Sequence, residues 1–245
     1  MKITDIKELE EQAKIIRRGI IEQVYCAQSG HPGGSLSIAD IMTVLYFNEL
    51  NVNPQDPNWE DRDRLVLSKG HCAPALYSAL AYRGFFPVED LKTFRKIGSY
   101  LQGHPDKNKT PGVDMTTGSL GQGLSCANGM AIAGKLNNKN YRVYCILGDV
   151  EIEEGQVWEA AMEANKYKLD NLCVIVDNNN LQIDGHNIDE ILKAFEVARN
   201  IKDKPVCIIA KTIKGKGVSY MENQVSWHGK APDEEQYKIA MKELS

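Results

Sequence analysis

Arg142-Val-Tyr-Cys-Ile-Leu147 decides the fold, together with two later runs of the same kind, Leu172-Cys-Val-Ile-Val176 and Val206-Cys-Ile-Ile-Ala210. Each is a short, continuous apolar run, which is typical of a strand that is buried on both faces. Segments with helical spacing, 155–167 and 189–199, separate the three runs. Because strands alternate with helices of this length, we expect βαβ units and an α/β fold with a doubly wound, mainly parallel sheet flanked by helices.

The rest of the chain continues the α/β pattern toward both termini. Apolar spacing predicts helices at 6–28, 36–48, 72–83, 88–96, 120–136 and 233–244, and a further strand at Arg64-Leu-Val-Leu67. Two long segments, 97–117 and 211–232, lack such spacing, and long irregular loops in a compact domain are usually functional or disordered. Their content of His, Gly and Trp favours a functional role over disorder. No repeat or linker is visible, so we expect a single domain over residues 1–245.

Composition and charge narrow the class of protein. The chain is 42% hydrophobic and 25% charged with a net charge of -4, so we expect no nucleic-acid partner, and the lysines of 211–216 predict only a solvated loop. No apolar run is long enough to span a bilayer, and the charged N-terminus does not resemble a secretory signal, so we expect no membrane association. Six cysteines without a C-x-x-C pair indicate a reducing compartment, and we expect the cytoplasm.

Polar residues follow two consecutive strands, in Leu147-Gly-Asp-Val-Glu151 and in Asp177-Asn-Asn-Asn-Leu-Gln-Ile-Asp-Gly185. Ligands gather at the carboxyl ends of strands in such sheets. The Asp149 carboxylate, an Asn amide and a carbonyl near Leu181 would suit Mg²⁺, which shares its shell with phosphate oxygens and water. Alternatively, Asp149 caps a helix and the Asn residues form a turn. The occurrence of both motifs on successive strand ends favours the metal site.

These motifs resemble the signature of thiamine diphosphate enzymes, through Gly148-Asp149, Glu154-Gly155, and Asn179 with Ile183-Asp-Gly185. The resemblance implies that Asp149, the Asn179 side chain and the Leu181 carbonyl hold Mg²⁺ or Ca²⁺. It also implies that the turn Gly148–Val150 contacts the cofactor diphosphate.

Val150 departs from this signature, which normally has glycine at the third position. Valine keeps the backbone N–H that would face the diphosphate, but its branched Cβ restricts the backbone and crowds the phosphate. We therefore expect weaker cofactor binding, and we expect Val150→Gly to tighten it.

Four of the five histidines lie in loops flanked by Gly or Pro, and none has a His or Cys at zinc-ligand spacing. Each alone would be read as a surface residue or a local hydrogen bonder. Together their surroundings resemble transketolase over roughly residues 10–235. The matching stretches are Ser29-Gly-His-Pro-Gly33, Asp61-Arg-Asp-Arg-Leu-Val-Leu-Ser-Lys-Gly-His71, Gly103-His-Pro105, Thr117-Gly-Ser-Leu-Gly-Gln-Gly123 and Trp227-His-Gly-Lys-Ala-Pro232.

The resemblance implies roles for these histidines. His31 and His228 would line the substrate channel and transfer protons, for which imidazole is suited near neutral pH. His71 and His228 would also reach the diphosphate, and His104 would hydrogen-bond the ketose hydroxyls.

Further residues would take part by the same resemblance. Gly118, Leu120 and Ile183 would contact the thiamine rings. Glu154 resembles an acid that joins a proton network across the dimer interface, but it could equally be a charge at the start of a helix.

The chain stops at Ser245, where the second domain of a transketolase would begin, so it is similar to the first subunit of a split transketolase. We expect it to transfer a two-carbon ketol unit between sugar phosphates, with pentose phosphates as the default. The partner would be a C-terminal subunit with the pyrimidine-binding and C-terminal domains, in an α2β2 heterotetramer, and this chain alone would be nearly inactive. Two alternatives remain: a non-catalytic subunit with impaired cofactor binding at Val150, and half of an enzyme resembling deoxyxylulose-phosphate synthase.

Overall fold

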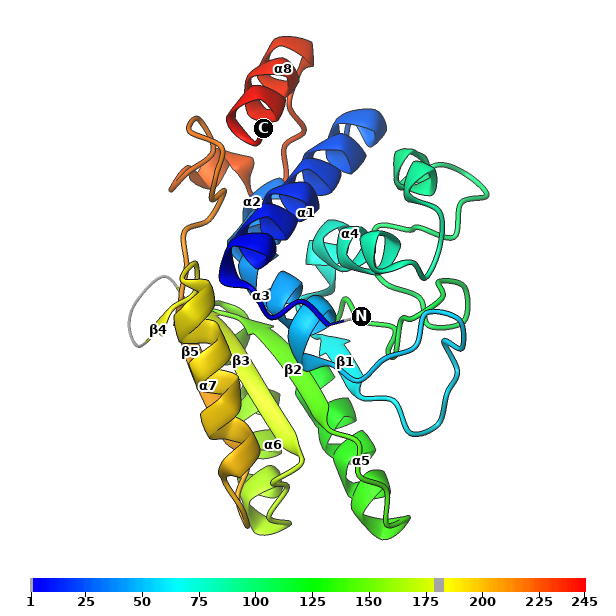
Figure 1. Cartoon of the computed structure of the whole chain (residues 1–245), viewed down its shortest axis with the longest axis vertical. Coiled ribbons are helices and arrows are strands. Elements are labelled where there is room, and N and C mark those ends of the chain that lie inside the picture. Colours follow the sequence, from blue (N-terminus) through cyan, green and yellow to red (C-terminus); the bar gives the residue numbers. More distant parts are fainter. Residues whose placement is uncertain (1, 179–182) are drawn as a thin grey trace.

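Five parallel strands form the centre of the protein, in the order β1-β2-β3-β5-β4, in a computed structural model that describes residues 2–178 and 183–245 (Figure 1). The strands are β1 Arg64–Leu67, β2 Val143–Gly148, β3 Leu172–Asn178, β4 Ile183–Asp184 and β5 Val206–Lys211. All four neighbouring pairs are parallel. The predicted parallel α/β sheet is therefore confirmed, and the short β4 is an addition that the sequence did not predict.

Helices cover both faces of the sheet, as predicted. Val143, Cys145 and Leu147 of β2 pack in one hydrophobic cluster with α5 (Gly123–Leu136) and α6 (Gly155–Lys166). Tyr144 and Ile146 of the same strand point to the opposite face, since side chains alternate along a strand. The helices on that face are α1 Ile6–Ala27, α3 Ala39–Val44, α4 Ala73–Arg83 and α7 Ile188–Asn200.

The predicted helix over 36–48 is wrong, because the segment forms three pieces. They are α2 (Pro32–Ser37), α3 and a π-helical turn, η1 (Leu45–Glu49). The first break falls at Ile38 (φ -101°, ψ 8°), directly after Ser37, whose hydroxyl is hydrogen-bonded to Asp177 at 2.7 Å. The same hydroxyl lies 2.9 Å from the Gly34 carbonyl, and serine side chains that bond to the preceding turn compete with the helical backbone. The Ser37–Asp177 hydrogen bond attaches the end of α2 to β3.

The predicted helix over 88–96 is also wrong in type and length. It is a 3₁₀ helix, η3, over Val88–Thr93. The buried Phe94 has φ -47° and ψ 129°, which is not helical, and Arg95 has φ +60°, a left-handed conformation, so the helix ends here.

The helix predicted at 120–136 begins three residues later, at Gly123, because Gly121 has φ +83° and its N–H donates to the Glu151 carboxylate. The C-terminal helix α8 (Glu234–Glu243) begins with a capping box between Asp233 and Gln236. It packs on α1 through stacked Tyr25 and Tyr237 rings, 4.1 Å apart.

Three further 3₁₀ helices are η2 Gly70–Cys72, η4 Glu151–Glu153 and η5 Val225–Trp227. None of the helices in the described part of the chain has the length and apolar composition needed to cross a membrane.

Candidate active site

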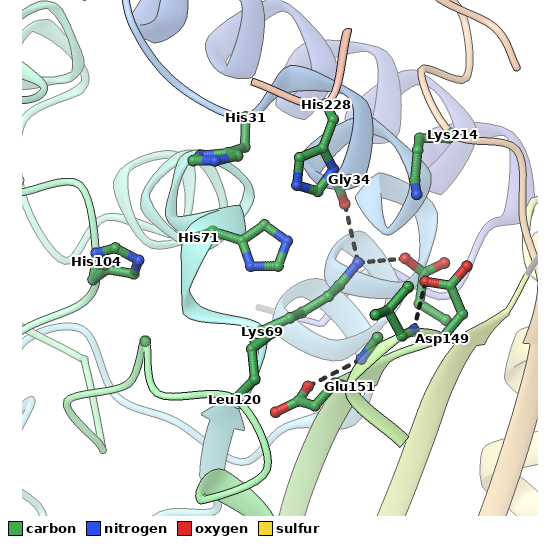
Figure 2. A pocket seen from close by; sticks show the side chains of 14 residues that line it. His31, Gly34, Lys69, His71, His104, Leu120, Asp149, Glu151, Lys214 and His228 are labelled. Carbon is green, nitrogen blue, oxygen red and sulfur yellow. Dashed lines mark hydrogen bonds and ion pairs between the residues drawn. The ribbon is translucent and has the colours of Figure 1, made fainter. Parts of the chain in front are cut away.

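A pocket of about 530 Å³ opens at the carboxyl ends of β1, β2 and β3 (Figure 2). Its lining comes from segments that are far apart in the sequence: His31, Gly34, Lys69, His71, His104, Gly118, Leu120, Gly148, Asp149, Val150, Glu151, Asp177, Lys214 and His228. This is the edge of a parallel sheet at which ligands bind in α/β folds.

Four histidines from four loops meet in this pocket. The ring centroids of His31, His71 and His228 lie 5.2 to 5.5 Å apart, and His104 lines the same cavity. Figure 2 shows the rings of His31, His71 and His228 grouped together, with His104 farther to the side and Asp149 on the opposite side of the view. The structure thus brings together all four histidines that the sequence singled out.

The pocket holds these imidazoles in the neutral form. Burial, followed by the charge of Arg95, lowers the pKa of His31 to about 4. Burial and Lys69 lower the pKa of His71 to about 3. The pKa of His104 and that of His228 are lowered by burial first, and then by Arg95 and by Lys214 respectively. At neutral pH all four rings are therefore neutral and can serve as hydrogen-bond donors or acceptors.

Asp149 and Val150 form the floor of the pocket, directly after β2. The backbone N–H of Val150 donates to the Asp149 carboxylate at 3.0 Å, and the Val150 side chain is 61% exposed. Val150 has φ -71° and ψ -30°, ordinary right-handed values for an L-residue. Valine is therefore accommodated here without backbone strain, and its exposed side chain lies where it could obstruct a ligand.

A buried ion pair that the sequence did not predict lies in the lining at the base of the pocket. The Lys69 ammonium contacts the Asp177 carboxylate and donates to the Gly34 carbonyl at 3.1 Å. Asp177 also accepts hydrogen bonds from Ser37 and Thr212. Burial alone would raise the pKa of Asp177, but Lys69 and these donors lower it below its usual value. The pair therefore stays charged.

Glu151 is a second residue that the sequence analysis did not single out. Its side chain is buried and accepts hydrogen bonds from the Ser68 hydroxyl and from the backbone N–H groups of Gly121 and Gly148, the latter two at 3.0 and 3.1 Å. These bonds attach the glycine-rich segment 118–123 to the end of β2.

Gly118 and Leu120 lie in the pocket wall, and the Gly118 backbone passes close to His104. A Cβ at Gly118 would come within 2.9 Å of the His104 ring, and its φ of +149° also favours glycine. This close approach explains why the segment needs glycine.

Other predicted residues lie elsewhere. Ile183 begins β4 and does not line the pocket, and Glu154 is exposed at the N-cap of α6, where its side chain makes no capping hydrogen bond. Asn179 and Leu181 lie outside the described residues, so Asp149 is the one predicted metal ligand that the structure describes.

Lys214 corrects the interpretation of 211–216 as only a solvated loop, because its side chain lines the pocket beside His228 (Figure 2). Cationic Lys69 and Lys214 with hydrogen-bonding histidines suit a polyanion, and the Asp149 carboxylate suits a hard cation bound to it. These residues together therefore suit a diphosphate group with a bound metal ion.

A parallel α/β sheet with this donor set at its carboxyl edge defines a class of diphosphate-binding proteins. The family model described as "Transketolase, thiamine diphosphate binding domain" matches residues 9–189 and 184–245. The chain therefore belongs to the transketolase family, as the resemblance of the histidine loops indicated.

The relatives include separate subunits as well as whole enzymes. The chain is 43% identical to the 6-deoxy-6-sulfo-D-fructose transketolase subunit SqwG of Clostridium sp. (strain MSTE9), over 97% of this chain and 96% of that one. It is 40% identical to an apulose-4-phosphate transketolase subunit from Phocaeicola vulgatus, over 98% and 95%. It is 44% identical to transketolase of Homo sapiens, of which it covers 40%. The crystal structure of transketolase from Campylobacter jejuni superposes with a TM-score of 0.92 at 37% identity, over 98% of this chain and 43% of that one.

Proposed function

We propose that this chain is the diphosphate-binding subunit of a two-chain transketolase, which transfers a two-carbon ketol unit from a ketose phosphate to an aldose phosphate. The observation that carries the proposal is the convergence of four neutral histidines with Lys214, Lys69 and Asp149 in the lining of one pocket. Two relatives named as transketolase subunits, which match nearly from end to end, support the two-chain organisation.

The chain would hold thiamine diphosphate through a divalent metal. Asp149, the Asn179 side chain and the Leu181 carbonyl would bind Mg²⁺ or Ca²⁺, while Lys214, His71 and His228 would face the diphosphate oxygens. When bound, the cofactor would supply the nucleophilic carbon that ketol transfer requires. Gly118 and Leu120 would support its rings, and Ile183, at the start of β4, is a further candidate for the same contact.

The histidines would handle the protons of the transfer. Breaking the C–C bond next to the ketose carbonyl requires a base to accept the proton of the adjacent hydroxyl, and the acceptor aldehyde later takes a proton back. His31 and His228 are neutral and close together, so either can accept and return that proton. His104, at the edge of the pocket beside Gly118, would hydrogen-bond the sugar hydroxyls.

A partner chain would cover the apolar surface next to the pocket. Trp158 and Met162 of α6 are 61% and 68% exposed, and an apolar cleft of about 210 Å³ lies between α6 and β5. Large exposed apolar side chains that cluster on one face are typical of protein interfaces. We infer that this face contacts other subunits in an α2β2 assembly.

The decisive experiment is reconstitution with the C-terminal subunit of the same enzyme. Calorimetry should detect thiamine diphosphate binding to the mixed subunits that depends on Mg²⁺, and ketol transfer should require both chains. The donor panel should include pentose phosphates and the sugars that the relatives' names indicate, 6-deoxy-6-sulfo-D-fructose and apulose 4-phosphate. Robust transfer by this chain alone would refute the two-chain proposal, and absent cofactor binding would favour a non-catalytic subunit.

A further inference from the structure

The turn formed by residues 213–216 carries Lys214 into the pocket, and three contacts fix its backbone. The Ile213 N–H donates to Nε2 of His186 at 2.8 Å. The Gly215 N–H donates to the Gly33 carbonyl at 2.9 Å, and the Lys216 carbonyl accepts from Nε of Arg17 at 3.2 Å. The position of Lys214 therefore depends on residues that lie outside the pocket.

Asp40 of α3 orients two of these anchors. Its carboxylate accepts from both terminal nitrogens of Arg17, at 3.0 and 2.5 Å, and lies 2.7 Å from Nδ1 of His186. The side chains of Arg17, Asp40 and His186 are only 7 to 9% exposed. Burial would raise the pKa of Asp40, but the Arg17 charge and the His186 contact lower it, so the carboxylate stays ionised.

The hydrogen bonds determine the tautomer of His186. A backbone N–H can only donate, so Nε2 accepts from Ile213 and carries no proton. The neutral ring must then carry its proton on Nδ1, where it donates to Asp40. His186 is thus a fixed link from the buried Asp40 to the backbone beside Lys214.

His186 also joins two segments of the candidate site. It directly follows Ile183–Gly185, and the Gly185 N–H donates to the Lys211 carbonyl at 2.7 Å. The residue therefore connects the end of the predicted metal-binding loop with the segment that leads to Lys214. It is the one histidine of five that does not line the pocket.

We propose that His186 is a positioning residue for diphosphate binding: held by Asp40, it fixes the 213–216 turn and so keeps Lys214 beside the bound anion. The inference rests on the proposed function, because it takes the diphosphate of thiamine diphosphate as the anion. His186 itself touches neither cofactor nor substrate.

Three substitutions separate the two hydrogen bonds of His186. His186→Phe removes both bonds, and we expect it to raise the Kd of thiamine diphosphate about tenfold, measured by calorimetry with Mg²⁺ on the assembled enzyme. Gln can place its side-chain oxygen near the Nε2 position and keep the Ile213 bond, so His186→Gln should stay within about threefold of wild type. Asn reaches only Asp40, so His186→Asn should behave like the Phe variant.

A double-mutant cycle with Lys214→Met tests whether His186 acts through Lys214. Lys214→Met alone should weaken binding, and it should add little in the His186→Phe background, where the lysine is already displaced. Losses that simply add, or wild-type affinity of His186→Phe, would overturn the proposal. If the Phe variant does not fold, equal affinities of the Gln and Asn variants would overturn it instead. Failure of the wild-type enzyme to bind the cofactor would refute the proposed function and is a separate outcome.

Discussion

Lys69 and Asp177, 108 residues apart in the chain, form a buried ion pair in the lining of the pocket that holds the four histidines. The pair joins the end of β1 to the end of β3, and its side chains are 3% and 8% exposed. It underlies the first of four predictions.

Lys69→Met should lower the free energy of unfolding by about 3–5 kcal/mol, because it leaves Asp177 buried without its counter-charge. Urea unfolding of the chain measures this change. The matched control is Lys193→Met, which breaks an exposed pair with Asp189 on α7 and should cost less than about 1 kcal/mol. Similar losses in the two variants would contradict this account of the Lys69 pair.

The lowered pKa values of the pocket histidines predict a stability that falls in acid. His31 has a pKa of about 4 in the folded protein and His71 one of about 3, against an ordinary value near 6.5 in the unfolded chain. Between these values the unfolded state binds more protons, so stability is fully present above about pH 6.5 and is lost as the pH falls toward 4.

The slope of stability against pH between about 4 and 6.5 should therefore be smaller in the His31→Gln/His71→Gln double variant than in wild type. Unfolding by urea at several pH values gives this slope. An unchanged slope would mean that the two imidazoles are not held neutral by the fold.

Val150→Gly should tighten thiamine diphosphate binding to the assembled enzyme, by about threefold, because it removes side-chain bulk beside the phosphates. Since φ and ψ at this residue are ordinary, Val150→Ala should give most of the same gain. Calorimetry compares the three proteins. Equal or weaker binding by both variants would eliminate crowding as an effect of Val150.

Trp158→Ala should weaken binding of the partner subunit at least tenfold, since a large aromatic side chain at the centre of an interface commonly contributes about 2 kcal/mol. Leu136→Ala is the matched control, because Leu136 is 77% exposed at the far end of α5. Sedimentation of the mixed subunits measures both. If the two substitutions have equal effects, α6 is not the docking face.

The sheet could be predicted well because its strands are continuous apolar runs with clear ends, as in β2 and β3. The four pocket histidines could be found for a related reason, since each lies in a distinctive Gly- or Pro-flanked loop. Local patterns of this kind can be read directly from the amino-acid sequence.

Contacts between distant segments could not be predicted in the same way. Lys69, Glu151 and His186 owe their roles to partners 108, 30 and 146 residues away, and no local periodicity marks such pairs. The break at Ile38 has the same origin, because the hydroxyl of Ser37, at the end of α2, is hydrogen-bonded to Asp177 of β3. Tertiary hydrogen bonds here override local helical spacing.

The residues that line the pocket are spread along the chain from His31 to His228. The order of synthesis therefore limits when each part of the pocket can form. The strands that carry Asp149 and Asp177 can pair before the ribosome has made the turn with Lys214, and His228 arrives later still. A nascent chain can therefore have a nearly complete sheet before Lys214 and His228, which line one side of the pocket, have been synthesised. A cofactor held by these residues would therefore bind only after most of the polypeptide has been made.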